Sequence, residues 1–275
     1  MSQMWTQIQE AVAFIREKTE FQPEIGLILG TGLGELGQQI EADCIIPYSD
    51  VPHFVESTAT SHEGNLVLGT LAGRRVLAMV GRVHFYEGYS MQEITLPVRV
   101  MQALGANSLL ISNAVGGMNP QMAAGDITVI TDHINLMGDN PLIGHNDDRL
   151  GPRFPDMSEP YNRSYIDTME QVALSEGIAL RRAVYVAVAG PNLESGAEYR
   201  FLRAIGADTV GMSTVPENLV AVHGGMKVVA LQVITDACFP DNLKPANVED
   251  IIKVANDAQP RLVKLVTGFL AKAEL

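Results

Sequence analysis

The chain has few cysteines, a shortage of basic residues and no long apolar run, and each shortage excludes a class of protein. Its two cysteines, Cys44 and Cys238, lie far apart and outside any motif, so neither a disulfide framework nor a zinc site is predicted. Lysine and arginine total 19 against 32 acidic residues, and the net charge of −13 excludes the basic surface that nucleic acids require. No apolar run approaches the roughly 18 residues that span a bilayer.

The first residues also lack the basic and apolar regions of a secretory signal, and the sequence therefore predicts a cytoplasmic protein with no membrane partner. What the chain does have is a large apolar fraction, since 47% of its residues are hydrophobic. With no internal repeat or change of composition, we expect one globular domain over residues 1–275. The acidic charge does not exclude a small anion as ligand, because local donors can hold a single phosphate.

Several apolar segments run directly into glycine-rich or polar turns. Residues 25–29, 76–80 and 109–112 are predicted to be buried strands. The turns that follow them are Gly30-Thr31-Gly32-Leu33-Gly34, the segment 81–88 and Asn113-Ala114-Val115-Gly116-Gly117. Ligands of open α/β sheets bind beyond the carboxyl ends of the strands, so these turns are expected to meet at one site of a parallel or mixed sheet.

The segment Gly81-Arg82-Val83-His84-Phe85-Tyr86-Glu87-Gly88 gathers a guanidinium, an imidazole, a phenol and a carboxylate. Arg82 offers a planar fork of donors for an oxyanion, and His84 points the same way if the strand continues. The segment therefore predicts a phosphate site, the alternative being an ordinary corner with surface charges. The turn at Gly30 is a second phosphate candidate, but its glycine spacing does not match the dinucleotide fingerprint.

Two predicted helix starts add further candidates. Ser195 is predicted to cap a helix over 197–205, and Glu194 before it is either a helix-dipole charge or a ligand acceptor. Ser213 precedes a helix with Pro216 in its first turn, where it either caps the helix or donates to a phosphate. In the long loop 138–160, Phe154 either covers a pocket or packs against its own loop.

Four segments together resemble the trimeric, low-molecular-mass purine nucleoside phosphorylases, within the purine nucleoside and methylthioadenosine phosphorylase family. They are the segment 81–88, Asn113-Ala114-Val115-Gly116-Gly117, Gly190-Pro191-Asn192-Leu193-Glu194 and Gly211-Met212-Ser213-Thr214-Val215-Pro216-Glu217. The resemblance covers nearly the whole chain. It implies an α/β fold in a single domain, with a central mixed, partly barrel-like sheet flanked by helices, and a homotrimer.

The resemblance also implies a reaction in which phosphate attacks the anomeric carbon of a purine nucleoside and releases free purine and pentose 1-phosphate. Inosine, guanosine and their deoxy forms are the leading substrates, phosphate is a co-substrate, and no cofactor or metal is expected. The catalytic candidates are His84, Glu194 and Asp236.

The binding residues that the resemblance implies fall into three groups. The phosphate would be held by Thr31, His62, Arg82, His84, the Ala114 backbone N–H and Ser213. Glu194, Asp236 and Leu193 would contact the purine. The pentose would lie near Tyr86, Tyr185, Met212 and Val248, and Phe154 would close the pocket of the neighbouring subunit. Glu87 is expected to be a structural partner of a nearby basic group.

Asp236 departs from the pattern of the enzymes specific for 6-oxopurines, which have asparagine there. An ionised aspartate only accepts hydrogen bonds, whereas the amide also donates to O6. Methylthioadenosine phosphorylases carry aspartate at this position, and they usually have an apolar residue at the position matched to Val248. In this chain, Leu193 also replaces the phenylalanine that is usual in the purine nucleoside phosphorylases. A broadened or adenine-type specificity is therefore one alternative, and a non-catalytic nucleoside-binding module is an alternative of another class.

Overall fold

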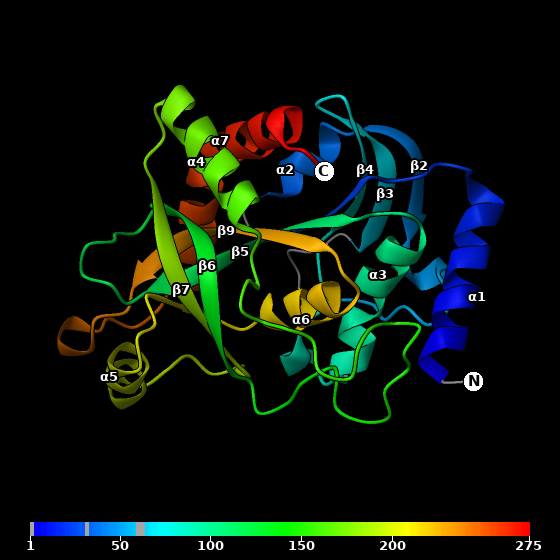
Figure 1. Cartoon of the computed structure of the whole chain (residues 1–275). Helices are drawn as coiled ribbons and strands as arrows, with labels where there is room; N and C mark the ends of the chain where they lie inside the picture. Colours follow the sequence, from blue (N-terminus) through cyan, green and yellow to red (C-terminus); the bar gives the residue numbers. More distant parts are fainter. Residues whose placement is uncertain (1–2, 31–32, 59–63) are drawn as a thin grey trace.

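A nine-stranded sheet forms the centre of the computed structural model, which describes residues 3–30, 33–58 and 64–275 (Figure 1). The strands are β1 Ile25–Leu29, β2 Glu41–Pro47, β3 Asn65–Leu71, β4 Arg74–Val80, β5 Ser108–Gly117, β6 Ile127–Leu136, β7 Leu180–Val188, β8 Thr209–Gly211 and β9 Lys227–Ala237. Their order across the sheet is β2-β3-β4-β1-β5-β8-β7-β6-β9, and β9 also pairs with β5. The strands β5, β8, β7, β6 and β9 therefore close into a ring, which confirms the predicted mixed, partly barrel-like sheet.

Helices cover both faces of this sheet. They are α1 Gln3–Lys18, α2 Gly34–Gln38, α3 Met91–Ala103, α4 Arg163–Glu176, α5 Gly196–Ala204, α6 Val215–His223 and α7 Val248–Lys272, with short 3-10 turns η1 Tyr48–Asp50, η2 Phe85–Glu87 and η3 Pro240–Asn242. In Figure 1, α4 and α7 pack together on one side of the sheet and α3 and α6 on the other. In the described part of the chain, none of the helices is long and apolar enough to cross a membrane.

Local sequence signals explain where several elements begin. The hydroxyl of Ser195 accepts from the backbone N–H of Glu198, whose carboxylate accepts from the N–H of Ser195, and this capping box starts α5 as predicted. Apolar runs over 65–70 and 74–80 on either side of Leu71-Ala72-Gly73 predict a hairpin. The strands β3 and β4 form it, and Ala72 and Gly73 at its turn both have positive φ. The segment 137–162 contains no helix or strand, in agreement with the predicted long loop.

Two predictions of local structure are wrong. Residues 113–117 are not a turn, because β5 continues through Gly117 and pairs with both β9 and β8. A Cβ at Gly116 would lie 2.5 Å from the Cys238 Sγ, so glycine permits this close approach. Pro260 predicts an interruption of the last helix, because proline cannot donate to the preceding turn, but α7 runs through it. The buried face of α7, which includes Leu262 and Phe269, packs against the body. Packing of a long amphipathic face outweighs one missing hydrogen bond.

Candidate active site

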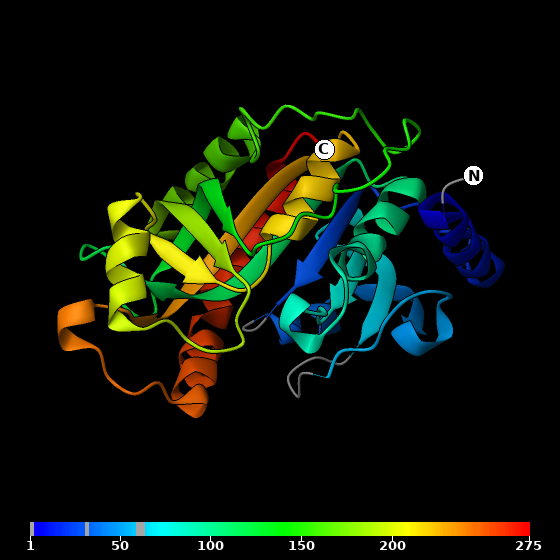
Figure 2. The ribbon, with the colours of Figure 1, turned by 90° about the horizontal axis from the view of Figure 1, so that it is seen from below.

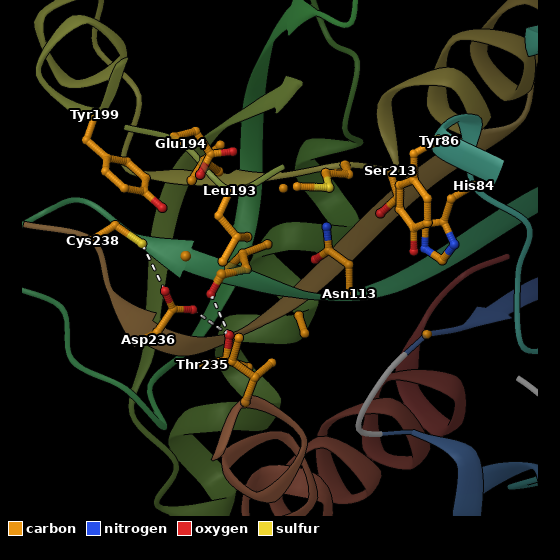
Figure 3. Close-up of a pocket in the computed structure, with 18 of the residues that line it drawn as sticks. His84, Tyr86, Asn113, Leu193, Glu194, Tyr199, Ser213, Thr235, Asp236 and Cys238 are labelled. Atoms are coloured by element: carbon orange, nitrogen blue, oxygen red, sulfur yellow. Dashed lines mark hydrogen bonds between the residues drawn. The ribbon is translucent and has the colours of Figure 1, made fainter. Parts of the chain in front are cut away.

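A cavity of about 230 Å³ opens where strand ends meet, at the carboxyl ends of β1, β4 and β9 and beside β5 and β8. Gly30 lies directly after β1, and a Cβ there would come 2.5 Å from the Ser112 carbonyl oxygen, so the residue must be small. Figure 3 shows polar side chains at two ends of this cavity. His84, Tyr86 and Ser213 lie at one end, and Glu194, Tyr199, Asp236 and Cys238 lie at the other. The cavity therefore has a cationic end and an acidic end, because the first adjoins Arg82 and the second contains two carboxylates.

Arg82 is buried at the first end and held by three neighbours. Its Nη1 donates to the Glu217 Oε1 at 3.1 Å and to the Thr214 Oγ1 at 3.3 Å, and its Nη2 donates to the Ser112 carbonyl oxygen. The side chains of Arg82 and Glu217 are only 2% and 6% exposed, so this is a buried ion pair. Such a pair fixes the guanidinium in one orientation at the cavity wall.

Thr214 holds an unusual backbone conformation beside Arg82. Its φ of 71° and ψ of −46°, together with a 2.8 Å hydrogen bond from the Val215 N–H to the Ser213 carbonyl oxygen, define a γ-turn. A threonine with these angles is strained, and such strain persists only where the surroundings over-determine it. Here the Thr214 hydroxyl accepts from Arg82 and from the Asn113 Nδ2 at 3.0 Å. The turn places Ser213 at the cavity, directly before the N-terminus of α6.

His84 is oriented by a carboxylate behind it. The Glu87 Oε1 accepts from the His84 backbone N–H at 2.7 Å and lies 3.2 Å from the His84 Nδ1, while Oε2 accepts from the backbone N–H and hydroxyl of Thr58. The Tyr86 ring stacks on His84 with centroids 4.8 Å apart. Glu87 is therefore the structural partner of a basic group, as the sequence predicts.

The far end of the cavity is acidic. The Thr235 hydroxyl donates to the Asp236 Oδ1 at 2.9 Å, and the Cys238 Sγ donates to Oδ2 at 3.0 Å, so both carboxylate oxygens are oriented (Figure 3). Burial raises the pKa of the Cys238 thiol far above its ordinary value, with a further contribution from Asp236, and the thiol stays protonated as a donor. Burial and the neighbouring Cys238 and Glu194 likewise raise the pKa of Tyr199. Two carboxylates and two protonated groups thus face one small volume.

Comparison with known proteins identifies the family. Residues 24–271 match the model of the phosphorylase superfamily. The chain is 47% identical to purine nucleoside phosphorylase 1 of Bacillus subtilis over 98% of its own length and 100% of that protein. It is 43% identical to the purine nucleoside phosphorylase of Mus musculus, with 95% and 93% of the two chains covered. The chain belongs to the purine nucleoside phosphorylases.

Solved purine nucleoside phosphorylase structures share this fold. Isoform 2 from Schistosoma mansoni, in complex with cytosine and ribose-1-phosphate, superimposes with a TM-score of 0.94 at 39% identity over 98% of each chain. The enzyme of the same organism in complex with adenosine gives a TM-score of 0.93 at 36% identity, again over 98% of each chain. The family resemblance that the sequence predicts is therefore confirmed, and the chain is a member of a family of pentosyltransferases.

The structure brings many of the sequence-predicted purine nucleoside phosphorylase residues to the same cavity. Those that line it are Arg82, His84, Tyr86, Ala114, Leu193, Glu194, Met212, Ser213 and Asp236. Two predicted phosphate ligands, Thr31 and His62, lie outside the described residues. Among the residues described, no group of histidine, cysteine, aspartate and glutamate side chains is arranged to hold a metal ion.

Three predicted pentose residues lie elsewhere. Tyr185 is buried behind the cavity wall, where its hydroxyl donates to the Ser213 carbonyl oxygen at 3.0 Å and accepts from the Ser213 N–H at 3.2 Å. Val248 is 67% exposed at the start of α7 and does not line the cavity, whereas Ile251, one helical turn later, does. The assignment of Val248 to the pentose stays a prediction, and Ile251 is a second apolar candidate on the same helix. Phe154 is 87% exposed and away from the cavity of its own chain.

Sequence reasoning missed other residues that line the cavity. They include Asn113, Tyr199, Thr235, Cys238 and Ile251. Asn113 lies inside a motif that the sequence singled out, and Thr235 and Cys238 flank Asp236, so proximity could have suggested these three. Tyr199 lines the cavity only because of the way α5 is oriented, and the sequence carries no signal for that orientation.

Replacing Glu87 by glutamine is expected to lower stability in a pH-dependent manner. Burial alone would raise the pKa of Glu87 above its ordinary value of 4.5, but the hydrogen bonds from Thr58 and His84 outweigh it and lower the pKa. The carboxylate therefore stabilises the fold above pH 4.5, and this contribution is lost as the pH falls through the lowered pKa. Urea unfolding should show wild type about 1 kcal/mol more stable than Glu87→Gln at neutral pH. The difference should shrink in acid.

The matched control is Glu20→Gln, which changes an exposed carboxylate far from this site along the chain. A stability difference between wild type and Glu87→Gln that stayed constant down to pH 3 would contradict the lowered pKa.

Proposed function

We propose that this chain catalyses the phosphorolysis of purine nucleosides, with inosine, guanosine and their deoxy forms as leading substrates. The observation that carries the proposal is the cavity with oxyanion donors at one end and two carboxylates at the other. A nucleoside whose base faces the acidic end places its anomeric carbon between the base and a phosphate at the cationic end. The products are a free purine and a pentose 1-phosphate. Phosphate is the co-substrate, and the proposed reaction needs no cofactor.

The phosphate end supplies a positive charge and oriented hydrogen-bond donors. Arg82 contributes a fixed guanidinium, and Ser213 contributes a hydroxyl at the N-terminus of α6, where backbone donors and the helix dipole favour an anion. The Ala114 backbone and His84 complete this end, and His84 is oriented by Glu87. Cleavage of the glycosidic bond builds positive charge on the pentose, so an anionic phosphate held beside it stabilises the transition state. No side-chain nucleophile is required.

The other groups position the pentose and the base. Tyr86 and Met212, with Ile251, line the stretch where the pentose would lie. Glu194 would accept from the N1–H of a 6-oxopurine, and Asp236 from a protonated N7 as negative charge grows on the leaving base. In well-positioned reactions, holding both substrates in one orientation lowers the activation free energy by on the order of 7 kcal/mol.

A direct assay tests this proposal. Base release is followed spectrophotometrically with inosine, guanosine, adenosine and methylthioadenosine, each with and without phosphate. We expect phosphate-dependent cleavage that is fastest for inosine and guanosine. Preferred cleavage of methylthioadenosine would indicate the adenine-type alternative. Binding of nucleoside without phosphate-dependent cleavage would leave only a nucleoside-binding module and overturn the proposal.

The variant Asp236→Asn is expected to shift base preference toward 6-oxopurines. Both Asp236 oxygens accept in the wild type, from Thr235 and Cys238, and an amide would replace one acceptor by a donor. The Cys238 thiol is a weaker donor than the Thr235 hydroxyl, so the amide oxygen should stay on Thr235. The amide nitrogen should then turn toward Cys238 or toward O6 of the base. We expect the ratio of kcat/KM for inosine over adenosine to rise about tenfold, the effect of about one hydrogen bond.

The control for this variant is Asp241→Asn, which changes a carboxylate that is 89% exposed in η3. An unchanged inosine-to-adenosine ratio in Asp236→Asn would show that Asp236 does not contact the base.

A homotrimer in the cytoplasm belongs to the same proposal, with Phe154 closing the pocket of the neighbouring subunit. The support is its position, because an aromatic side chain that is 87% exposed contributes little to its own chain's core. Phe154→Ala should therefore leave the free energy of unfolding within about 0.5 kcal/mol of wild type. It should raise the nucleoside KM about tenfold, as expected when one buried aromatic contact is lost.

Steady-state kinetics and analytical ultracentrifugation check the Phe154 prediction. Leu174→Ala is the matched control, because Leu174 is 84% exposed and lies on α4. A monomeric wild type, or an unchanged KM in Phe154→Ala, would contradict the shared pocket.

A further inference from the structure

A second cavity, of about 90 Å³, lies apart from the active site and shares none of its lining residues. It is bounded by α3, by the C-terminal end of α6 and by the loop 137–162. Its polar lining includes Arg99, His223, Gln92, His145 and Asn146. Nothing in the proposed reaction uses these groups.

Arg99 is a buried cation that lacks an anionic partner among the described residues. Arg99 is 6% exposed, and among the described residues its side chain makes one hydrogen bond, which joins Nη1 to the His223 Nδ1 at 3.4 Å. Arg82 is buried to a similar degree but is paired with Glu217. Burial lowers the pKa of Arg99 to about 10, so the guanidinium still carries its charge at neutral pH. Most of its N–H donors are therefore without acceptors.

His223 lines the same cavity and holds Arg99 in place. Burial and the neighbouring Arg99 lower the pKa of this histidine, so its ring is neutral at pH 7. If Nδ1 accepts from Arg99, the proton of the neutral ring lies on Nε2. The buried Nε2 makes no hydrogen bond of standard geometry among the described residues, but the Pro152 carbonyl lies close enough to the ring to raise its pKa and to act as its acceptor. Arg99 and His223, on two different helices, thus line one cavity, and the guanidinium has no anionic partner there among the described residues. A buried charge is seldom left without a partner in proteins.

Among the described residues, no carboxylate lies within ion-pair distance of Arg99. Asp147 also lines the cavity, but its two carboxylate oxygens accept from the Nε and Nη2 of Arg149 at 2.7 and 2.5 Å. Arg153 lies close enough to His223 to lower its pKa further, which makes the surroundings more positive. The C-terminal end of α6 carries a partial negative charge that opposes an anion, but this effect is weaker than a full unpaired cation.

We propose that this cavity is a binding site for a free oxyanion, of the size and charge of phosphate, between Arg99 and His223. A volume of about 90 Å³ is several times the roughly 10–15 Å³ that one water molecule needs, so the cavity has room for one tetrahedral oxyanion. Water alone would satisfy the donors but would leave the buried charge uncompensated. A bound anion would tie the loop 137–162 to α3 and α6.

Equilibrium dialysis with radiolabelled inorganic phosphate tests this site. Wild type should show two classes of phosphate site, and Arg99→Gln should retain only the active-site class together with phosphate-dependent cleavage of inosine. The control is Arg163→Gln, which removes the charge of an exposed arginine on α4 and should keep both classes. A single class in wild type, or a second class that persists in Arg99→Gln, would overturn the proposal.

A second measurement needs no variant and covers the case in which Arg99→Gln does not fold. Crystals of wild type soaked in selenate should show an anomalous peak in this cavity, within hydrogen-bond distance of Arg99. Ordered water there, or a carboxylate from a second copy of this chain, would overturn the proposal. Both readouts are independent of catalysis, so a failure of the proposed function in the nucleoside assay would not be confused with a failure of this site.

Discussion

Replacing Arg82 by methionine is expected to abolish phosphate-dependent cleavage and to destabilise the fold at the same time. The substitution removes the guanidinium from the phosphate end and leaves the Glu217 carboxylate buried without its partner. Breaking one side of a buried ion pair costs about 3–5 kcal/mol, a large part of the stability of a typical domain. Loss of a charged donor that acts on the transition state lowers kcat/KM by about 1,000-fold.

The double variant Arg82→Met, Glu217→Gln separates these two effects. Removing the second charge as well should restore most of the stability, because no uncompensated ion remains buried. It should not restore catalysis, because the phosphate still lacks its cation. Urea unfolding and kinetics of the two single variants and the double variant provide the full cycle. Activity that recovered together with stability would show that Arg82 serves only the fold.

Replacing Glu194 by alanine is expected to lower kcat/KM for inosine about 100-fold, which corresponds to one hydrogen bond to a charged group. Glu194 lines the acidic end and is only partly buried, so its loss should change stability little. The effect on adenosine should be smaller, because adenosine has no N1–H for the carboxylate to accept. The ratio of kcat/KM for inosine over adenosine should therefore fall.

The matched control is Glu198→Gln, because Glu198 lies on α5 close to Glu194 but caps the helix at Ser195. A glutamine there preserves the capping box and should preserve activity. If Glu194→Ala left inosine cleavage unchanged, the role assigned to Glu194 would be wrong.

Much of the fold follows from local signals in the sequence. Apolar runs predict strands β1 and β4, and the capping residue Ser195 marks a helix start that the structure confirms. The errors at residues 113–117 and at Pro260 share one cause. Glycine and proline signal a break locally, but pairing of β5 with β9 and packing of α7 stabilise a continuous element instead.

The site was predictable to the extent that its residues lie in recognisable segments. Arg82, His84 and Ser213 follow strand ends or precede a helix, and strand ends converge by topology. Ile251 shows the limit of this reasoning. Whether Val248 or Ile251 faces the cavity depends on the rotation of α7 about its axis, which is set by what the helix packs against and not by its own sequence.

By itself, the sequence determined the chemistry that is available: the donors of segment 81–88, the carboxylates Glu194 and Asp236, and the strand ends that gather them. Only the tertiary structure decided how these groups are paired. It joined Arg82 to Glu217, set Cys238 against Asp236, and left Arg99 buried without an anion among the described residues. Such pairings join residues far apart in sequence, and they depend on strand register and helix rotation that only the packed core imposes.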